Sequence, residues 1–408
     1  MPRHNLKRPF DVVLYGATGF VGKQTVDYFA QQPDVKASGL RWALAGRSKA
    51  RLEQVRQACG GAAKSGVVVA AAGDTKALDA LAKSTHVVLS TAGPFALYGS
   101  ALVAACVKHG THYVDITGET PWAAEMIAKH HAKAAEDGTR IIPFCGFDSV
   151  PSDIGTWLMT QAMQQRHDAA CADVTAAFTV RGGVNGGTLA SLFNIMGSEQ
   201  AKLVENPFLL NPGAVKQRDM KANQDPVTPR YDPELKTWLG PFFMSPINTR
   251  VVRRSAALLD YGDGFRYQEY LRLGQGWAAG AAAASLSAGM GVSKVAMRFS
   301  AVRRIAAMVV PKPGQGPSEA SMNNGSFRCE LIGRSASGGV LRGRVADEGD
   351  PGNRATTKMV CEAALCLALD TDKLPGGAGY GGVLTPAAGL GDVLVSRLRQ
   401  AGMTLVID

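Results

Sequence analysis

Between Asp11 and Phe144 short apolar runs alternate with longer stretches of helical periodicity, and this alternation limits the possible folds more than any other feature of the chain. The expected strands are 11–15, 42–45, 67–71, 86–90, 112–116 and 140–144. The expected helices between them are 21–30, 49–58, 78–83, 100–109 and 122–136, which are long enough to be crossovers between parallel strands. The pattern predicts an α/β fold with a Rossmann-type, doubly wound parallel sheet, whose ligands bind beyond the carboxyl ends of the strands.

After residue 150 the alternation stops, and the pattern indicates an α+β region. Residues 204–250 contain many Pro and Asn residues with little periodicity, so we expect a long loop there, suited to a lid or a dimer contact. The other expected elements are a helix from about 151, strands at 173–180, 265–273, 326–332 and 340–345, a helix at 355–369, and a closing helix and strand. The strands at 326–332 and 340–345 are expected to pair as a hairpin.

Composition narrows the ligand classes. The 408 residues include 44 Lys and Arg against 34 Asp and Glu, and the net charge of +10 favours phosphate-bearing ligands. The basic residues are dispersed and no zinc-finger or helix-turn-helix signature accompanies them, so nucleic acid is not expected as a partner. The seven cysteines are odd in number and contain no CxxC, which predicts neither a disulfide framework nor a metal site.

The first ten residues are basic and lack an apolar core segment before the first expected strand, so no secretory signal is expected and the cytoplasm is the predicted location. One segment leaves a question open. The stretch "GWAAGAAAASLSAGMGVSKVAM" from Gly276 is uncharged until Lys294, and Arg298, Arg303, Arg304 and Lys312 follow it. Such a helix could line an acyl pocket or lie on a membrane surface as a peripheral contact. Its apolar character all round favours a third use, burial in the core.

The first strand runs into "GATGFVG", a glycine-rich turn. Its glycines are spaced three and three, whereas the commonest dinucleotide fingerprint spaces them two and three. A strand that passes through glycines into a helix supplies backbone N–H groups, free space and the positive end of a helix dipole, which together suit a pyrophosphate. Because the turn is the first strand-to-helix turn of the series, we predict a cofactor loop made of Gly16, Ala17, Thr18, Gly19, Phe20, Val21 and Gly22.

The end of the second expected strand indicates which dinucleotide binds. Enzymes that use NAD usually carry an acidic residue there, which accepts a hydrogen bond from the ribose 2′-hydroxyl. This sequence has Arg47 followed by Ser48, and a guanidinium matches a 2′-phosphate in charge and in geometry. The sequence therefore predicts NADP. The alternative is that Ser48 caps the next helix and Arg47 is a solvated surface charge.

Three further loops follow strand ends and complete the predicted cofactor site. Asp74, after the third strand, is expected near the adenine, although it could simply cap the next helix. After the fourth strand come small residues and a proline that would let a flat nicotinamide ring approach: Thr91, Ala92, Gly93 and Pro94. Asp115 and Glu119, after the fifth strand, could shape the nicotinamide pocket, with helix capping at Thr117 or Glu119 as the alternative.

Hydride transfer also needs a proton donor or acceptor and contacts to the substrate. Tyr98 is one candidate donor, with packing as the alternative. Asp148 is the other, because it is expected at a strand end that faces the cleft between domains. Ser149 beside it is a candidate substrate contact. Gly187 and Thr188 open a helix whose N-terminus could receive a carboxylate or thioester oxygen, with a plain turn as the alternative.

Motifs along nearly the whole chain resemble the saccharopine dehydrogenase-like oxidoreductases, and especially their trans-acting enoyl reductase branch. The motifs are "GATGFVG", "AGR", "STAGPFALYGSALVAACVKHGTHYVDITGE", "IIPFCGFDSVPSD", "GGT", "PKPGQGPSE", "DPGNRATTKMVCEAAL" and "GGVLTPAAGLGD". The resemblance implies an NADP-binding Rossmann domain over residues 1–147. It also implies a substrate domain over 148–353 that often makes a homodimer contact, and a C-terminal segment, 354–408, that packs back on the first domain.

The family resemblance implies dehydrogenase or reductase chemistry more firmly than any one substrate. Because the second domain is rich in Ala, Leu and Met, we expect an NADPH-dependent reductase of an apolar unsaturated substrate, such as an enoyl or polyketide-derived acyl group. Two alternatives stay open. One is a saccharopine-type amino-acid dehydrogenase, and the other is a non-catalytic protein that binds NADP or a lipid surface.

Overall fold

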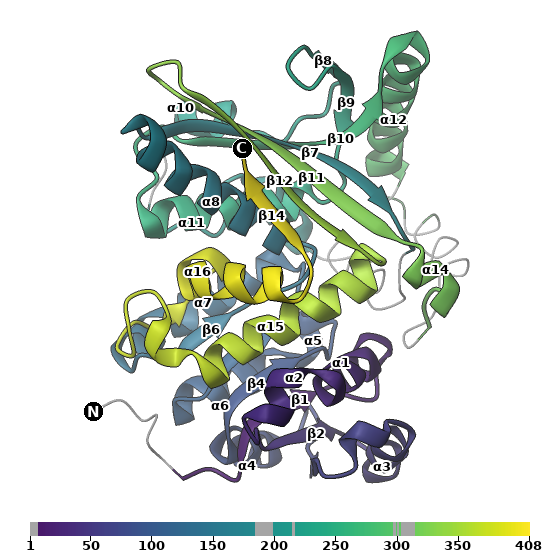
Figure 1. The fold of residues 1–408 in the computed structure, drawn as a ribbon, viewed down its shortest axis with the longest axis vertical. Coiled ribbons are helices and arrows are strands. Elements are labelled where there is room, and N and C mark those ends of the chain that lie inside the picture. The colour runs from purple at the N-terminus through teal and green to yellow at the C-terminus, as the bar shows by residue number, and fades with distance from the viewer. Residues whose placement is uncertain (1–6, 184–198, 214–216, 297–298, 300–301, 303–314) are drawn as a thin grey trace.

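The chain forms two seven-stranded sheets with a layer of helices between them (Figure 1). The computed structural model describes residues 7–183, 199–213, 217–296, 299, 302 and 315–408. The first sheet, sheet A, has the strand order β13-β6-β5-β4-β1-β2-β3, and all of its pairings are parallel. The predicted doubly wound sheet is therefore confirmed. The strands of sheet A are β1 Phe10–Tyr15, β2 Trp42–Gly46, β3 Gly66–Val69, β4 Thr85–Ser90, β5 His112–Asp115, β6 Arg140–Ile142 and β13 Gly382–Val383.

Both faces of sheet A are covered, which explains why its strands read as continuous apolar runs. Val12 and Leu14 of β1 point into one hydrophobic core and Val13 into the other. The helices of this half are α1 Phe20–Gln31, α2 Pro33–Ala37, α3 Lys49–Ala58, α4 Thr75–Ser84, α5 Phe95–Tyr98, α6 Ser100–His109 and α7 Thr120–Glu136. Helix α15, Thr356–Leu369, comes from the far end of the sequence and packs against α1 and the central strands of sheet A.

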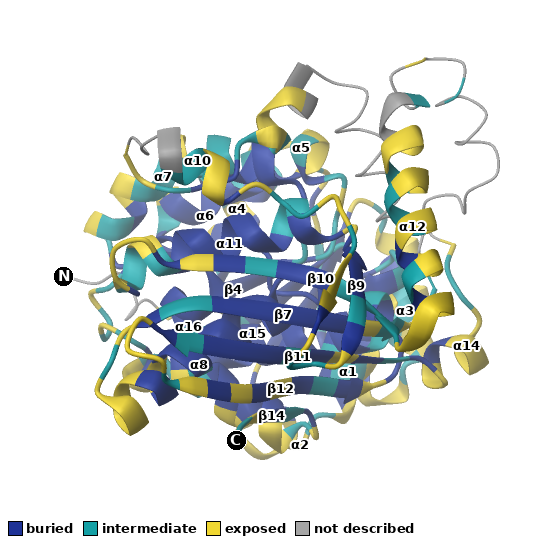
Figure 2. Cartoon of the chain, turned by 90° about the horizontal axis from the view of Figure 1, so that it is seen from above, coloured by how far each residue is buried: buried dark blue, intermediate teal, exposed yellow. Residues whose placement is uncertain are grey.

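The second sheet, sheet B, is mixed and has the order β14-β12-β11-β7-β10-β9-β8. Its strands are β7 Cys171–Arg181, β8 Arg230–Asp232, β9 Thr237–Pro241, β10 Arg266–Gly274, β11 Ser326–Ser335, β12 Val340–Glu348 and β14 Thr404–Ile407. The predicted hairpin of β11 and β12 is confirmed. Three helices pack against one face of the sheet: α8 Val150–His167, α11 Ser245–Leu259 and α16 Pro386–Gln400. Along β12 exposed and buried residues alternate, as expected for a sheet with one covered face (Figure 2).

The predicted long loop at 204–250 is wrong in part, because this stretch contains β8, β9, helix α10 Gln217–Ala222 and the start of α11. Helix α11 was not predicted from the sequence because three of its arginines are buried. Arg250, Arg253 and Arg254 are each at most 2% exposed and donate hydrogen bonds to backbone carbonyls, including those of Val204, Pro207 and Leu210. Buried arginines satisfied in this way remove the polar-outside pattern on which helix prediction depends.

Helix α12, Gly276–Ala296, was expected in the core and is instead largely exposed. Trp277 is 87% exposed, and a narrow strip that includes Ala279 and Ala283 is buried. The helix packs along β9, where a Cβ on Gly240 would lie 3.1 Å from the Leu286 side chain. Because most of its residues are alanine or glycine, the helix offers too little apolar volume to fill a core.

None of the described helices combines the length and the hydropathy that a membrane-spanning segment requires. The remaining short helices are η2 Gly60–Ala62, η3 Glu199–Glu205, α14 Glu319–Asn323, η5 Thr371–Lys373 and a single π-helical turn, η4 Pro351–Ala355.

Candidate functional site

The turn between β1 and α1 is closed so tightly that it requires glycine. Gly16 has φ +87°, and a Cβ there would lie 2.9 Å from the backbone nitrogen of Ala92. A Cβ on Gly22 would lie 2.1 Å from the carbonyl oxygen of Gly16. The turn is held by hydrogen bonds from Gly16 N to Ala45 O, 3.0 Å, and from Gly19 N to Gly16 O, 2.9 Å. The third glycine, Gly22, therefore allows close packing of helix on strand.

The first turn of α1 is open to an anion. Its N-cap residue, Gly19, has no side chain to satisfy the free N–H groups, and the first turn carries no acidic residue. Thr18, Gly19 and Phe20 are partly exposed, whereas Ala17, Val21 and Gly22 are buried beneath them. The arrangement fits the pyrophosphate of a dinucleotide in space, hydrogen-bond donors and charge.

A loop from the second half of the chain reaches this turn. A Cβ on Gly316 would lie 2.4 Å from the ring of Phe20, so the two residues are in direct contact. Pro317 follows and packs against Gly183 at the end of β7, where a Cβ would lie 2.5 Å from the Pro317 ring. The predicted cofactor loop therefore lies at the boundary between the two halves of the molecule.

Arg47 lies at the end of β2, is exposed, and forms no hydrogen bond or ion pair with another described residue. Ser48 accepts a hydrogen bond from Arg51 N at 3.5 Å and is the N-cap of α3. Asp74 is exposed and caps α4 by accepting from Ala77 N at 3.0 Å. The capping alternatives for Ser48 and Asp74 are therefore present in the structure, and the Arg47 guanidinium is available for a ligand.

The loop after β4 packs directly against the glycine turn. Thr91 N donates to Tyr15 O at 2.9 Å, and the Gly93–Pro94 peptide bond is cis. The following helix, α5, is anchored by Glu119, whose two carboxylate oxygens accept from Phe95 N at 2.7 Å and Ala96 N at 3.0 Å. Glu119 thus holds the loop after β4 in place. It caps a helix, but the helix is α5, which lies more than 20 residues before it in the sequence.

Asp115 is fully buried, and both of its carboxylate oxygens have partners. They accept from Tyr113 OH at 2.8 Å, Thr117 N at 3.0 Å and Phe144 N at 3.3 Å. Burial raises the pKa of Asp115 to about 7, although the hydrogen bonds from Thr117 and Tyr113 favour its ionised form. Asp115 joins the loops after β5 and β6, and both of its carboxylate oxygens accept hydrogen bonds from within the protein.

Asp148 lies in the loop between β6 and α8 and differs from these acids. Its carboxylate forms no hydrogen bond or ion pair with any described residue, and burial alone raises its pKa to about 7. It keeps partial contact with solvent. A Cβ on Gly118 would lie 3.5 Å from Asp148 Oδ2 and 3.0 Å from Ile247 Cδ1, so the group lies between the loop after β5 and the start of α11.

Ser149, the next residue, is fully buried, and its hydroxyl donates to Asn248 Oδ1 at 3.3 Å. Asn248 in turn donates to Glu269 Oε1 at 2.9 Å. The sequence analysis missed Asn248 and Glu269. The available signal was an acidic residue in the middle of the otherwise strand-like run "FRYQEYLRL".

The remaining candidates are not joined to Asp148. Tyr98 is 45% exposed on α5, and its hydroxyl forms no hydrogen bond with the described residues. Gly187 and Thr188 lie outside the described residues. Within the described ranges, no three His, Cys, Asp or Glu side chains are grouped as metal ligands would be.

Comparison with known proteins decides the family. Residues 12–142 match the family model of the saccharopine dehydrogenase NADP-binding domain. The trans-acting enoyl reductases of Mycobacterium tuberculosis and Mycobacterium leprae are both 38% identical to this chain, with 98% of each chain covered. A second Mycobacterium tuberculosis protein, for which that name is provisional, is 39% identical over 98% of this chain and 97% of its own length. The chain belongs to the trans-acting enoyl reductase family.

Solved structures support the fold of this enoyl reductase family member. The saccharopine dehydrogenase of Saccharomyces cerevisiae that forms L-glutamate aligns over 98% of this chain and 99% of its own, with a TM-score of 0.53 and 13% identity. At that identity the likeness shows the fold alone. The family match and the glycine turn together make this protein an oxidoreductase that depends on a nicotinamide dinucleotide.

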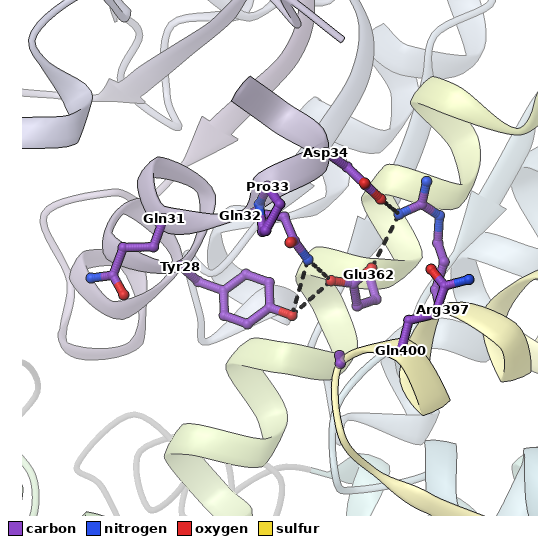
Figure 3. A pocket seen from close by; sticks show the side chains of 9 residues that line it. Tyr28, Gln31, Gln32, Pro33, Asp34, Glu362, Arg397 and Gln400 are labelled. Carbon is purple, nitrogen blue, oxygen red and sulfur yellow. Dashed lines mark hydrogen bonds and ion pairs between the residues drawn. The ribbon is translucent and has the colours of Figure 1, made fainter. Parts of the chain in front are cut away.

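This family member also has a polar hollow of 340 Å³ at the far end of α1 from the glycine turn (Figure 3). Glu362 of α15 lies at its centre and accepts hydrogen bonds from Tyr28 OH, at 2.6 Å, and from Gln32. Arg397 of α16 contacts Glu362 at 3.3 Å and Asp34 at 3.1 Å. The contacts join α1 and α2 to α15 and α16, so this cluster connects the C-terminal segment to the N-terminal half.

Proposed function

We propose that this protein is an NADPH-dependent enoyl reductase that reduces an apolar acyl substrate, with Asp148 as its proton donor. The observation that carries the proposal is the environment of the Asp148 carboxyl. It lies at the carboxyl edge of sheet A and forms no hydrogen bond with any residue that the structure describes. The names of the relatives support the enoyl substrate, and the match to an NADP-binding domain supports the cofactor.

Cofactor selection rests on Arg47. An NAD-specific site would place a carboxylate at this position, whereas Arg47 offers a fork of N–H donors that forms no hydrogen bond or ion pair with the described residues. The 2′-phosphate of NADPH would pair with this guanidinium, with the N–H groups at the start of α1 holding the pyrophosphate. In this arrangement Asp74 and Ser48 support the adenosine end of the site, and their capping bonds fix the helices that border it.

The nicotinamide would lie against the loop after β4, where Thr91, Ala92, Gly93 and Pro94 present small side chains. Glu119 and Asp115 hold this loop and the neighbouring β5 loop in place from behind. When bound, NADPH supplies the hydride. The chain therefore has to exclude water, orient the double bond and deliver one proton.

Reduction of an enoyl group adds a hydride at one carbon and a proton at its neighbour. An acid with a pKa near the working pH delivers a proton efficiently and is then readily reprotonated. Burial gives Asp148 this property, because its pKa of about 7 lies far above that of an ordinary aspartate. Its partial contact with solvent provides the route for reprotonation. Tyr98 is the alternative donor, but its side chain is 45% exposed and its hydroxyl forms no hydrogen bond with the described residues.

The cofactor part of the proposal is tested by titration calorimetry with NADPH and NADH on the wild-type protein and on Arg47→Ala. The wild type should prefer NADPH, and Arg47→Ala should lose about 1.5–3 kcal/mol of NADPH binding with little change for NADH. Lys49→Ala is the matched control, since it removes a neighbouring charge outside the strand end. An unchanged preference in Arg47→Ala would exclude Arg47 from 2′-phosphate recognition.

The exposed apolar residues of helix α12 support a second proposed role for this protein, a contact with lipid. It exposes Trp277 at 87% and Val292 at 69%, and residues 276–293 carry no charge. Such a surface suits the interfacial region of a bilayer, where the apolar substrate would also partition. Flotation with vesicles should carry the wild-type protein upward, and Trp277→Ser should weaken this. Equal behaviour of the two proteins would assign α12 another role.

A further inference from the structure

Next to Asp148, starting at Ser149, lies a chain of buried hydrogen bonds that the reaction itself does not use. Ser149 donates to Asn248 at 3.3 Å, and Asn248 donates to Glu269 Oε1 at 2.9 Å. The other oxygen of Glu269 accepts from Ser152 Oγ and from Tyr267 OH, both at 2.9 Å. All five residues are fully buried, and they come from α8 and its N-cap, from α11 and from β10.

A carboxyl group buried in this way is costly, since water no longer solvates its ionised form. Burial raises the pKa of Glu269 to about 7, and the hydrogen bonds from Ser152, Tyr267 and Asn248 favour ionisation. An apolar side chain could fill the same volume at lower cost. The network is therefore a candidate for a specific task near the active site.

The network fixes the direction in which the Ser149 hydroxyl points. Because the amide nitrogen of Asn248 donates to Glu269, the amide oxygen of Asn248 faces Ser149 and accepts from it. The single hydroxyl proton of Ser149 is thus committed to Asn248. Ser149 is also the N-cap of α8, where a serine oxygen would usually accept from the first turn, yet it makes no such bond.

We propose that Glu269 and Asn248 are positioning residues that hold the Ser149 hydroxyl away from the adjacent Asp148, so that the Asp148 carboxyl keeps its proton for the substrate. The inference rests on the proposed function, because it takes Asp148 as the proton donor. A hydroxyl that donated to Asp148 would stabilise the carboxylate and lower the pKa of Asp148.

The other acids around Asp148 are already satisfied. From β5 and its loop, Asp115 is bound by Tyr113 and two backbone amides, and Glu119 by the amides of Phe95 and Ala96. From α8, Asp153 accepts from Ser255 Oγ and from the backbone amide of residue 387. None of these charges contributes to the raised pKa of Asp148, which burial alone explains. Freeing the Ser149 hydroxyl is therefore the direct way to change it.

The test is Asn248→Leu, which keeps the branched shape of the side chain and removes the acceptor of Ser149. The pKa of Asp148 is followed by isotope-edited infrared spectroscopy of its carboxyl group, with Asp148→Asn to assign the signal. We expect the pKa of Asp148 to fall by about one unit, and the reductase rate above pH 7 to fall about tenfold as the protonated fraction falls. Adding Ser149→Ala to Asn248→Leu should restore the pKa of Asp148, which a purely structural role would not predict.

Ser255→Ala is the matched control, because it breaks a buried hydrogen bond between the same two helices, α8 and α11. It should lower thermal stability without moving the pKa of Asp148. If Asn248→Leu does not fold, Asn248→Ala gives the same comparison. An unmoved pKa in the Asn248 variants, or no restoration by Ser149→Ala, overturns the positioning role. Failure of the protein to reduce any enoyl substrate would instead refute the proposed function, since the spectroscopic titration needs no turnover.

Discussion

Two carboxyl groups in this protein have pKa values raised by burial but have opposite surroundings. Glu362, in the hollow of Figure 3, is saturated by Tyr28, Gln32 and Arg397. Asp148, in the loop between β6 and α8, forms no hydrogen bond or ion pair with any described residue. Burial raises the pKa of both, but at Glu362 the three partners favour the ionised form. A partnered acid holds elements together, and an unpartnered one is free to exchange a proton.

The comparison is broken most directly by Asp148→Asn, which keeps the shape of the side chain and removes its proton. If Asp148 is the proton donor, the rate of enoyl reduction should fall about 10²–10⁴-fold, the usual contribution of general acid catalysis. NADPH affinity, measured by calorimetry, should stay unchanged, because the side chain lies outside the predicted pyrophosphate and ribose contacts.

The same substitution also changes the pH profile. In the wild type the rate should be flat below about pH 7 and fall about tenfold per unit above it, as Asp148 loses its proton. Asp148→Asn should lose this limb. A wild-type profile without a limb near pH 7, or a variant that keeps it, would point to another donor, and Tyr98→Phe would then be the variant to examine.

The opposite result is expected for Glu362→Gln. The substitution removes the charge that faces Arg397 and disturbs the bonds from Tyr28 and Gln32, so it should lower the free energy of unfolding by about 2–4 kcal/mol. Chemical denaturation measures this loss. Because α15 covers the central strands of sheet A, the whole N-terminal half should lose stability together.

Activity per folded molecule separates the two acids. Below its unfolding temperature, Glu362→Gln should retain the wild-type rate of reduction, whereas Asp148→Asn should not. Arg397→Lys is the matched control for the hollow, since it keeps the positive charge but loses the fork that reaches Glu362, Asp34 and Asp370. A large loss of rate in Glu362→Gln would show that the hollow, too, has a catalytic role.

The sequence predicted the part of the fold that is local. The strands of sheet A are buried on both faces and end at turns, so they read as short apolar runs, and the glycine turn follows from β1 directly. Prediction from the sequence failed where long-range contacts bury residues that a local pattern assigns to the surface. Arg253 and Arg254 have charged side chains but are buried, because backbone carbonyls more than 40 residues away in sequence accept hydrogen bonds from their guanidinium groups.

The candidate site shows the same division. Its loops were predicted because carboxyl ends of parallel strands share one edge of the sheet. The difference between Asp115 and Asp148 was not predicted, since Asp115 has two donors close in sequence and a third, Phe144 N, that is 29 residues away, whereas no described residue donates to Asp148. Glu269 escaped notice for the same reason: Ser152, one of its donors, is 117 residues away in sequence.

The smallest expected effect is the influence of Asp148→Asn on the free energy of unfolding, and it depends on pH. The pKa of Asp148 is about 7 in the folded state and near 3.8 when unfolded, so between these values the folded state binds the proton more tightly. Wild-type stability from this group is therefore greatest at low pH and is lost as pH rises through about 7. Asp148→Asn cannot ionise, so it should be more stable than the wild type by about 1–2 kcal/mol at pH 8 and equally stable near pH 4.

Denaturation of both proteins across this pH range measures the difference. Glu362→Gln should be less stable than the wild type at pH 8, because Arg397 loses its partner there. A wild type that is more stable than Asp148→Asn at pH 8 would mean that the Asp148 carboxylate has a stabilising partner after all. A gain with Asp148→Asn and a loss with Glu362→Gln at the same pH would confirm that hydrogen-bond partners, rather than burial, decide which acid stabilises the fold and which one is free to give up a proton.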